Sequence, residues 1–534
     1  MQHFLHNQTL HEQSPQSPQS PQSPQSPQSP QSPQSPQSPQ SPQSQSLRNQ
    51  TRCAGVLLHI SSLPAGDFGA DAIRFVDFLA DIGAAVWQTL PLNMPHDDGS
   101  PYQCLSAHAG NPAFISLQSL VQQNLLTTDD LIFNRDGVPA NRHDMLAKAY
   151  FNYKHDQNTA LQHEFVGFCR ENVAWLGDFA AFLVLREKFK YSSWSAWPSA
   201  YKNKQPAAIA KLKQRYAHEI AVIKFTQFLF FKQWQVLKTY ANQKGIAMFG
   251  DIPIFVAYDS ADVWAKPHLF KLDAHKNMQV VAGVPPDYFC ETGQRWGNPH
   301  YNWQAMQANG FKWWQSRMRT QQRMFDLVRI DHFRGLEAAW EIPANEETAI
   351  NGTWVLAPGD ALLRVLRRRF PHLQLIAEDL GVITAEVDAL REKHQLPGMK
   401  ILQFAFGGDD SNPYLPANIE ANSVVYPGTH DNDTSLGWYH ALDENAKNHL
   451  HALLETSAPI MPQALVALAL ASKADMAIIP MQDILGLDAA HRMNTPGSIV
   501  DNWQWRFTWD MLSQSAQQHI KQAIAQTNRT KKWH

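Results

Sequence analysis

Eight short runs of β-branched or apolar residues, separated by longer stretches with helical periodicity, limit the folds open to this chain more than any other feature. Strand-like runs that alternate with helices are typical of βα units around a parallel sheet. We expect strands at residues 55–59, 85–90, 245–251, 327–330, 375–377, 400–404, 423–426 and 476–479. Eight such units predict an α/β fold of the (β/α)₈, or TIM barrel, type.

The chain is much longer than a plain barrel requires. A barrel of this kind takes about 250 residues, whereas the chain has 534. The widest gap between expected strands lies between residues 92 and 245, and residues 173–189 within it show helical periodicity. We therefore expect α-rich insertions between strands, with an inserted subdomain at about residues 112–240. Because the chain stops soon after the eighth strand's closing helix, we expect no separate C-terminal β-domain.

The N-terminal segment differs in composition from the rest. Residues 14–43 repeat the triplet Ser-Pro-Gln without one apolar residue, so this segment has nothing to bury in a core. Repeated Pro favours an extended polyproline conformation and matches the P-x-x-P pattern of some recognition ligands, but an inert tail is the favoured interpretation, because short motifs in biased composition match by chance. We expect residues 1–51 to be a disordered low-complexity tail and residues 52–534 to form the folded domain.

Composition excludes several classes of partner and location. The formal net charge of −3 gives no electrostatic footprint for nucleic acid or an anionic membrane. The longest apolar stretch, residues 464–471, is far shorter than the roughly 20 residues that span a bilayer. No secretory signal is recognisable at the N-terminus. Scattered cysteines argue against a disulfide framework or a zinc site, and we expect reduced thiols in a cytoplasmic protein: Cys53, Cys104, Cys169 and Cys290.

Acidic residues follow three of the expected strands directly. In residues 327–335 (LVRIDHFRG), strand alternation places Arg329 and Asp331 on one face, with Asp331 at the carboxyl end, where barrel enzymes carry their catalytic groups. A buried Arg beside an Asp would hold that carboxylate ionised, as a nucleophile requires. A structural Arg–Asp pair is the alternative interpretation.

The second and third acids extend this pattern. Glu378 follows residues 375–377, and Asp431 follows residues 423–426 within the segment 427–434 (PGTHDNDT). Folding alone does not account for an acid at three strand ends. Two carboxyl groups across a site are what glycosidic cleavage needs, one to protonate the leaving oxygen and one to attack or stabilise the sugar cation.

Four blocks then make a resemblance specific. They resemble the four signature regions of the α-amylase superfamily, in the form of its amylomaltase or disproportionating-enzyme branch, glycoside hydrolase family 77: 251–256 (DIPIFV), 329–335 (RIDHFRG), 377–381 (AEDLG) and 429–434 (THDNDT). The similarity runs from about residue 55 to 506. It includes 283–289 (GVPPDYF), 293–299 (GQRWGNP), 492–497 (RMNTPG) and 502–506 (NWQWR).

The resemblance implies a 4-α-glucanotransferase of carbohydrate metabolism. Such an enzyme moves a segment of an α-1,4-glucan, as in starch, glycogen or maltooligosaccharides, to an acceptor glucose or maltooligosaccharide. It works by a retaining double displacement through a covalent glycosyl-aspartate. Carried over residue by residue, Asp331 is the nucleophile, Glu378 the general acid/base and Asp431 the transition-state stabiliser. Arg329 orients Asp331, and His430 bonds the sugar at the cleavage point.

The resemblance also assigns sugar-binding residues outside the three acids. Tyr102 follows the second expected strand and would lie at the barrel mouth. Residues 283–303 form a segment too irregular for a helix and too long for a plain connector, which is typical of a functional loop. In the family this loop arches over the cleft, so Asp287 and Trp296 would reach the bound glucan. Asp251 is expected to support the site structurally.

Alternatives remain at this point. The same three acids would serve a retaining α-glucan hydrolase, and a non-catalytic glucan-binding barrel is a remote second. No nucleotide-binding motif occurs, so we expect no cofactor. His430 and Asp431 lack a second cluster with ligand spacing, so we expect no metal. Oligomeric state, preferred glucan length, cyclic products and the ratio of transfer to hydrolysis stay open.

Overall fold

The computed structural model describes residues 52–132, 141–156, 158–286, 290–498 and 500–530. The predicted tail of residues 1–51 and the predicted sugar-binding residue Asp287 lie outside the described residues. Both therefore stay predictions.

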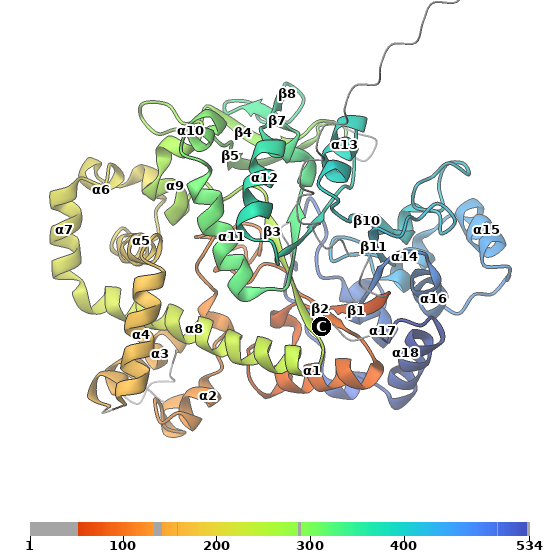
Figure 1. Ribbon diagram of the computed structural model, residues 1–534, viewed down its shortest axis with the longest axis horizontal. Helices are drawn as coiled ribbons and strands as arrows, with labels where there is room; N and C mark the ends of the chain where they lie inside the picture. Colours follow the sequence, from red (N-terminus) through yellow and green to blue (C-terminus); the bar gives the residue numbers. More distant parts are fainter. Residues whose placement is uncertain (1–51, 133–140, 157, 287–289, 499, 531–534) are drawn as a thin grey trace, which may run out of the picture. The chain divides into compact units, whose positions relative to one another are not determined.

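Eight parallel strands form one sheet, in the order β10-β11-β12-β1-β2-β3-β6-β9. Figure 1 labels β1, β2, β3, β10 and β11 of this sheet. Each of the eight strands overlaps one of the expected runs, so the predicted barrel is confirmed. Several boundaries differ by one to three residues. Residues 402–404, for example, were expected as strand and form a 3₁₀ turn after the sixth strand. The strands are β1 (Cys53–Leu57), β2 (Val86–Gln88), β3 (Ala247–Pro253), β6 (Leu327–Asp331), β9 (Gln374–Ala377), β10 (Gly398–Ile401), β11 (Ser423–Tyr426) and β12 (Met476–Pro480).

Side chains fill the centre of this barrel. The amide of Ala377, at the end of β9, donates to the carbonyl of Pro397 at 2.9 Å, just before β10, and so links the two outer strands of the sheet. One buried cluster takes at least one apolar side chain from every strand, which is possible only if the sheet curls around them. Its members include Leu57, Val86, Phe249, Leu327, Ile376, Met399, Val424 and Ile478. The barrel is therefore a packed core, and its strand ends, not its centre, are open to substrate.

Helices cover the barrel and continue to the end of the described chain. Beyond β12, the described residues 481–498 and 500–530 contain helices, turns and one isolated bridge between Cys53 and Thr530, but no further sheet. The covering helices are α1 (Ala70–Ile82), α9 (Ala261–Ala265), α10 (Trp303–Ala308), α11 (Lys312–Met324), α12 (Gly359–Arg369), α13 (Ala385–Lys393), α14 (Ser435–Ala441), α15 (Glu444–Leu453), α16 (Gln463–Ala471), α17 (Met481–Leu485) and α18 (Gln514–Gln526).

Among the described residues, seven helices lie between β2 and β3, on one side of the barrel in Figure 1. Four of them, α3, α4, α5 and α7, pack on the long helix α8, whose Phe225, Phe228 and Trp234 are buried. Their buried side chains join the same cluster as the barrel helices, and the definition of residues 112–240 as a subdomain stays a prediction. The helices are α2 (Leu117–Gln122), α3 (Arg142–His155), α4 (Thr159–Glu171), α5 (Leu176–Lys188), α6 (Ser199–Lys202), α7 (Pro206–Arg215) and α8 (Ala217–Gln243).

A small antiparallel sheet lies beside the barrel mouth, formed by segments that follow β3 and β6. Its order is β5-β4-β7-β8: β4 (Val280–Val284), β5 (Gln294–Pro299), β7 (Ala338–Pro343) and β8 (Thr353–Leu356). The expectation of an irregular segment at 283–303 was therefore wrong for β5. Two glycines that the pairing requires are residues typical of loops, so the sequence does not indicate strand β5. A Cβ on Gly283 of β4 would lie 2.1 Å from the carbonyl of Gln294, and Gly293, just before β5, has a φ of +64°.

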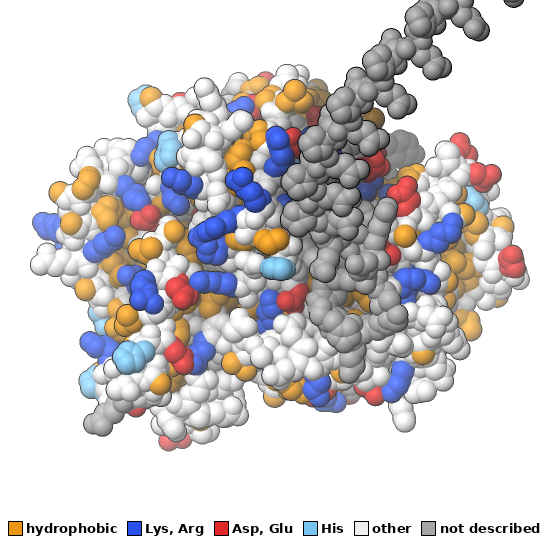
Figure 2. All heavy atoms as spheres, viewed as in Figure 1, with side chains coloured by type: hydrophobic (Ala, Val, Ile, Leu, Met, Phe, Trp, Pro, Cys, Tyr) orange, Lys and Arg blue, Asp and Glu red, His pale blue; other side chains and the backbone are white. Residues whose placement is uncertain are grey.

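The surface bears charges of both signs. Basic and acidic side chains are interspersed over the face shown in Figure 2, in line with the small net charge. None of the described helices is both long and apolar enough to cross a membrane.

Candidate active site

Strand register brings the first two predicted catalytic acids together. Ile330 of β6 pairs with Ala377 of β9, so Asp331 and Glu378 are the next residues on neighbouring strands. Backbone bonds continue the ladder past this pair, because the amide of Glu378 donates to Ile330 and its carbonyl accepts from Phe333, each at 3.1 Å. The carboxyl groups of Asp331 and Glu378 therefore start from adjacent points at the carboxyl end of the barrel.

Arg329 links one of these acids to a third strand. Asp251 of β3 is its cross-strand partner, and Arg329 Nη1 donates to Asp251 Oδ2 at 2.5 Å. The other arm, Nη2, forms an ion pair with Asp331 Oδ1. The guanidinium side chain is only 5% exposed, so both bonds form away from bulk solvent. Arg329 thus orients Asp331, as the sequence predicts, but it divides its charge between two carboxylates.

The sequence argument held that a buried Arg329 would keep Asp331 ionised. Burial raises the pKa of Asp331 to about 6; Arg329 opposes the rise, while the charges of Asp251 and Asp431 add to it. Asp331 is therefore a basic carboxylate that is largely ionised at neutral pH.

Burial acts in the same direction on Glu378. Burial raises its pKa well above the usual value, and the neighbouring charge of Asp331 raises it further. Its Oε2 accepts from the amide of His332 at 2.6 Å, which fixes the carboxyl group beside the end of β6. His332 has a φ of +53°, a left-handed conformation that is uncommon outside glycine. The chain turns sharply there, and this turn aims the His332 amide at Glu378.

The third acid belongs to the loop after β11. His430 Nε2 lies 3.2 Å from Asp431 Oδ2, and Asn494 Nδ2 donates to Asp431 Oδ1 at 2.6 Å. Burial alone would raise the pKa of Asp431, but His430, Asn494 and Arg329 together hold it well below the usual range. Asp431 is therefore a permanent negative charge at the mouth.

Tyr102 joins the strands and loops of this mouth. Its hydroxyl donates to Asp251 Oδ2 at 2.7 Å and lies 2.9 Å from His430 Nε2. Arg329 Nη1 also donates to the Tyr102 hydroxyl, at 3.2 Å. The rings of Tyr102 and His430 stack with centroids 5.4 Å apart and planes 12° apart. Six predicted site residues thus lie in one connected group: Tyr102, Arg329, Asp331, Glu378, His430 and Asp431.

Trp296 reaches the same region from the small antiparallel sheet. It lies on β5, and its ring meets that of His332 edge-to-face, with centroids 4.7 Å apart. Its indole nitrogen donates to Gln294 Oε1 at 3.1 Å. Tyr301, from the same segment, is fully buried and donates to the carbonyl of Ile254 at 2.5 Å, so it serves the core. Of these two aromatic residues, Trp296 is the one beside the acids.

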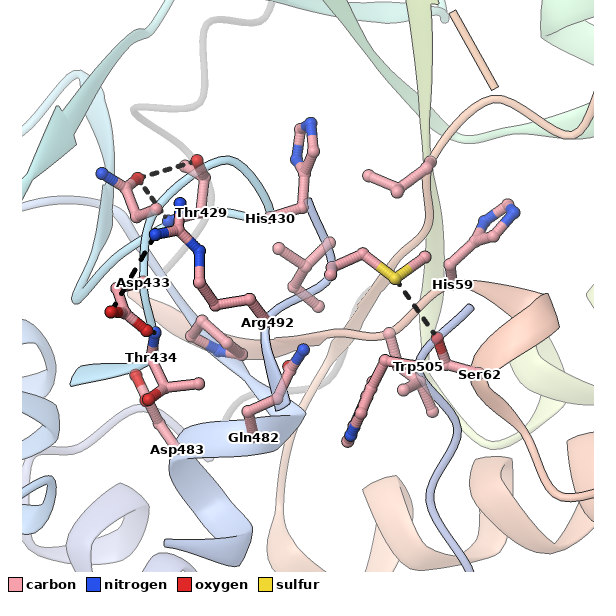
Figure 3. Close-up of a pocket in the computed structure, with 16 residues that line it drawn as sticks. His59, Ser62, Thr429, His430, Asp433, Thr434, Gln482, Asp483, Arg492 and Trp505 are labelled. Carbon is pink, nitrogen blue, oxygen red and sulfur yellow. Dashed lines mark hydrogen bonds and ion pairs between the residues drawn. The ribbon is translucent and has the colours of Figure 1, made fainter. Parts of the chain in front are cut away.

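A small cavity lies below His430, between the loops that follow β1, β11 and β12 (Figure 3). His59 and Trp505 are on one side, with Asp433 and Arg492 on the other. Its volume of ≈30 Å³ accommodates roughly one or two water molecules, not a sugar. The described residues contain no group of three or more His, Cys, Asp and Glu side chains placed to hold a metal ion.

Comparison with known families identifies the chain. A family model described as 4-alpha-glucanotransferase, of glycoside hydrolase family 77, matches residues 58–512. The chain belongs to this family. Two curated 4-alpha-glucanotransferases show the extent of the match. The one from Synechocystis is 43% identical over 489 residues, covering 88% of this chain and 96% of the relative. The one from Thermus thermophilus is 43% identical over 484 residues, covering 86% and 96%.

Solved structures of the family have the same fold. Amylomaltase from Streptococcus agalactiae, solved in complex with acarbose, superposes with a TM-score of 0.85 at 35% identity, over 90% of this chain and 99% of that one. Amylomaltase from Corynebacterium glutamicum, at 18% identity, superposes with a TM-score of 0.71 over 90% of this chain and 75% of that one, which shows the fold alone. The family assignment and the enzyme class expected from the sequence are thus confirmed.

Two polar residues of this family member were missed as site residues by sequence reasoning. Asn494 binds the carboxyl group of Asp431, and Arg492 Nη2 donates to the Asp431 carbonyl at 3.0 Å. Both occur in the block 492–497, which supported only the resemblance. They lie about 60 residues from Asp431, and no local pattern connects the two segments. Only the closing of the barrel, which brings the loop after β12 next to the loop after β11, shows their role.

Proposed function

We propose that this enzyme transfers a segment of an α-1,4-glucan to glucose or a maltooligosaccharide by a retaining double displacement. The observation that carries the proposal is the position of Asp331 and Glu378 on adjacent strand ends. Neighbouring strands lie about 4.8 Å apart, which suits the ~5–5.5 Å between carboxyl groups of retaining enzymes and not the ~6.5–9.5 Å of inverting ones. Retention also lets the product, still α-linked, serve as a new donor.

The two acids have the protonation states that the first step requires. Glu378, with its raised pKa, holds a proton near neutral pH and gives it to the oxygen of the breaking glycosidic bond. Asp331, largely ionised, attacks the anomeric carbon and forms the glycosyl-aspartate. Glu378 then takes a proton from the acceptor hydroxyl, which attacks the same carbon and releases Asp331.

The surrounding residues hold the reacting atoms and stabilise charge. The permanent negative charge of Asp431 faces the oxocarbenium-like transition state and stabilises it. Arg329 keeps Asp331 in its attacking position through the ion pair between them. The stacked rings of Tyr102 and His430 offer a wall for a sugar, whose apolar face packs on an aromatic ring while its hydroxyls bond at the edge.

Transfer requires that an acceptor sugar reach the intermediate before water does. Trp296, packed on His332 next to Glu378, is the residue we assign to this task. Asp287, which lies outside the described residues, stays a predicted contact of the bound glucan. A hydrophobic ring at the acceptor side excludes water and stacks the incoming sugar. Loss of this ring would favour the hydrolysis that the same three acids can perform.

Incubation with maltotriose tests the function directly. A ladder of longer maltooligosaccharides plus glucose is the expected product pattern. Glucose and maltose alone would establish a hydrolase, and unchanged maltotriose would establish a binding protein. Asp331→Asn serves as the matched control, because it keeps the shape of the site and removes the nucleophile. Its reaction mixture is expected to remain maltotriose.

The proposal extends to the location of the enzyme and to the roles of its two segments. Cysteines scattered without a pairing pattern favour a cytoplasmic enzyme, and the small net charge fits neutral glucans as substrates. The folded domain of residues 52–534 carries every residue of the mechanism, and residues 1–51 are assigned no part in it.

A further inference from the structure

A second, larger pocket lies beside the catalytic group. Its volume is ≈440 Å³, within the ~300–1,000 Å³ of small-molecule sites. The loops after β1 and β2 form most of its wall, and helix α3 and the segment 503–506 complete it. Its polar and aromatic lining includes His59, Asn93, Asn111, Arg142, Trp503 and Arg506. None of these residues has a role in the reaction proposed above.

Charge distinguishes this pocket from the catalytic group. Two guanidinium groups, those of Arg142 and Arg506, line it, whereas none of its described lining residues is an Asp or Glu. The catalytic group, by contrast, contains the carboxyl groups of Asp331, Glu378 and Asp431, with that of Asp251 bonded beside them. Sugar hydroxyls both donate and accept, and carboxylates are their common acceptors in proteins. A pocket that offers hydrogen-bond donors and no carboxylate oxygens therefore favours a ligand that only accepts hydrogen bonds.

Three acids close in sequence to the pocket lining accept hydrogen bonds from backbone amides, one of them from Ala65 of the lining itself. Asp67 accepts from the amide of Gly69 at 2.8 Å, Asp71 from the amide of Ala65 at 3.1 Å, and Asp98 from the amide of Ser100 at 3.1 Å. Asp67 is also close enough to Arg142 to raise the pKa of that guanidinium, although burial lowers it more. The positive charge of the pocket is therefore reduced at Arg142 and full at Arg506.

The donors are arranged differently at the two arginines. Arg142 Nη1 donates to the carbonyls of Pro112 and Ile115, which holds the guanidinium on the pocket wall while Nη2 and Nε make no hydrogen bond to described residues. Arg506 is exposed and makes no hydrogen bond or ion pair within the described chain. Asn111 accepts from Ala113 through Oδ1, which leaves its amide nitrogen to donate.

Trp503 connects this pocket to the catalytic group. Its ring lies 5.9 Å from that of Tyr102 and 6.0 Å from that of His430, and it also lines the pocket. The backbone at Trp503 has a φ of +66°, which is costly for a bulky residue and is retained where function requires it. A chain bound at Tyr102 and His430 can therefore extend past Trp503 into the pocket.

We propose that this pocket binds a phosphate group esterified to a sugar, held by Arg142, Arg506 and the amide nitrogen of Asn111. A guanidinium is the side chain best suited to phosphate because its parallel N–H groups match two oxygens. The sugar is either part of the glucan in the cleft or a free sugar phosphate. For the first source, the inference rests on the proposed glucan-transfer function.

Binding measurements without turnover test this. The full chain carrying Asp331→Asn is titrated by calorimetry with maltotetraose, with maltotetraose bearing one 6-phosphate ester, and with glucose 6-phosphate. The same titrations follow after adding Arg506→Gln, Arg506→Lys or Arg364→Gln. Arg364 is the charge-matched control, because its side chain is 68% exposed on α12 and is not part of the pocket.

We expect the phosphate ester to tighten maltotetraose binding about tenfold. Arg506→Gln should remove most of this gain, Arg506→Lys only part, and Arg364→Gln none. If glucose 6-phosphate binding depends on Arg506 in a similar way, the free sugar phosphate is a source of the bound phosphate group. If glucose 6-phosphate does not bind, the source is the glucan in the cleft.

Two results would overturn the proposal. One is equal binding of the plain and phosphorylated maltotetraose, with no Arg506-dependent binding of glucose 6-phosphate. The other is an equal loss on Arg364→Gln and Arg506→Gln. Neither outcome bears on glucan transfer, which the maltotriose assay decides with the unsubstituted enzyme.

Discussion

Replacing Asp331 by Asn is expected to stabilise the fold while it removes transfer. The pKa of Asp331 rises from 3.8 to about 6, chiefly because the folded protein buries the carboxylate. The folded state therefore holds the Asp331 proton more tightly than the unfolded state does. By linkage, ionisation of Asp331 costs stability at every pH above the unfolded pKa. Asn has a similar shape and no charge, so it avoids this cost.

The size of the effect follows from the two pKa values. A difference between 3.8 and about 6 corresponds to about 3 kcal/mol at 1.36 kcal/mol per pKa unit. The Asp331 side chain is 28% exposed, so solvent screening lowers this, and we expect a gain of about 1–3 kcal/mol. The gain should be complete at pH 8, shrink as the pH falls through about 6, and vanish below about 4, where both states are protonated.

Asp431→Asn provides the control of opposite sign at the same mouth. Its pKa is held well below the usual value, so the ionised form is favoured in the folded state. Removing that charge should lower stability at pH 8. Thermal unfolding of both variants and the unsubstituted enzyme, followed by circular dichroism from pH 4 to 8, gives the comparison. A lower melting temperature for Asp331→Asn at pH 8, or a difference that persists unchanged at pH 4, would refute the burial argument.

Four further outcomes are expected. With α-glucosyl fluoride, whose leaving group needs no acid, Glu378→Gln should keep the fluoride-releasing step and Asp331→Asn should lose it by orders of magnitude; equal losses in a fluoride assay would contradict the division of roles. The kcat/KM for maltotriose should fall as the pH decreases through about 6, because protonated Asp331 cannot attack, and should fall again at high pH as Glu378 loses its proton. Asp251→Asn should move the acid limb of that profile to lower pH, since Arg329 then serves Asp331 alone; an unchanged limb would mean that the charge of Asp251 does not reach Asp331. Trp296→Ala should raise the ratio of hydrolysis, measured as reducing ends, to transfer, measured as glucose and longer chains from maltotriose; proportional loss of both would show that the ring only holds substrate.

Much of the fold could be predicted because its strands are local patterns. Each buried strand is a short apolar run, and the acid after the run identifies the carboxyl end that faces substrate, as at Glu378. Once both strand ends are identified, the pairing of Ile330 with Ala377 follows from them. Strand β5 lacked such a pattern, because the run QRWGNP contains one aromatic residue and is held by its partner β4.

Electrostatics could not be predicted because they depend on distant segments. Asp331 receives the charges of Asp251, 80 positions earlier, and Asp431, 100 positions later, and its burial depends on every strand between them. The sequence shows Arg329 beside Asp331 and suggests a low pKa. It does not show that a second carboxylate shares the guanidinium.

The shared guanidinium explains how one site keeps an acid and a base ready at the same pH. If Arg329 served Asp331 alone, the carboxylate would be a weak base and hence a weaker nucleophile. Burial raises the pKa of Asp331 toward neutrality, and Asp251, bonded to Arg329 and Tyr102, adds to this rise while most of the Asp331 population stays ionised. The charge of Asp331 in turn raises the pKa of Glu378 and keeps its proton in place. The nonreacting Asp251 therefore affects both catalytic groups: Asp331 through the arginine, and Glu378 through Asp331.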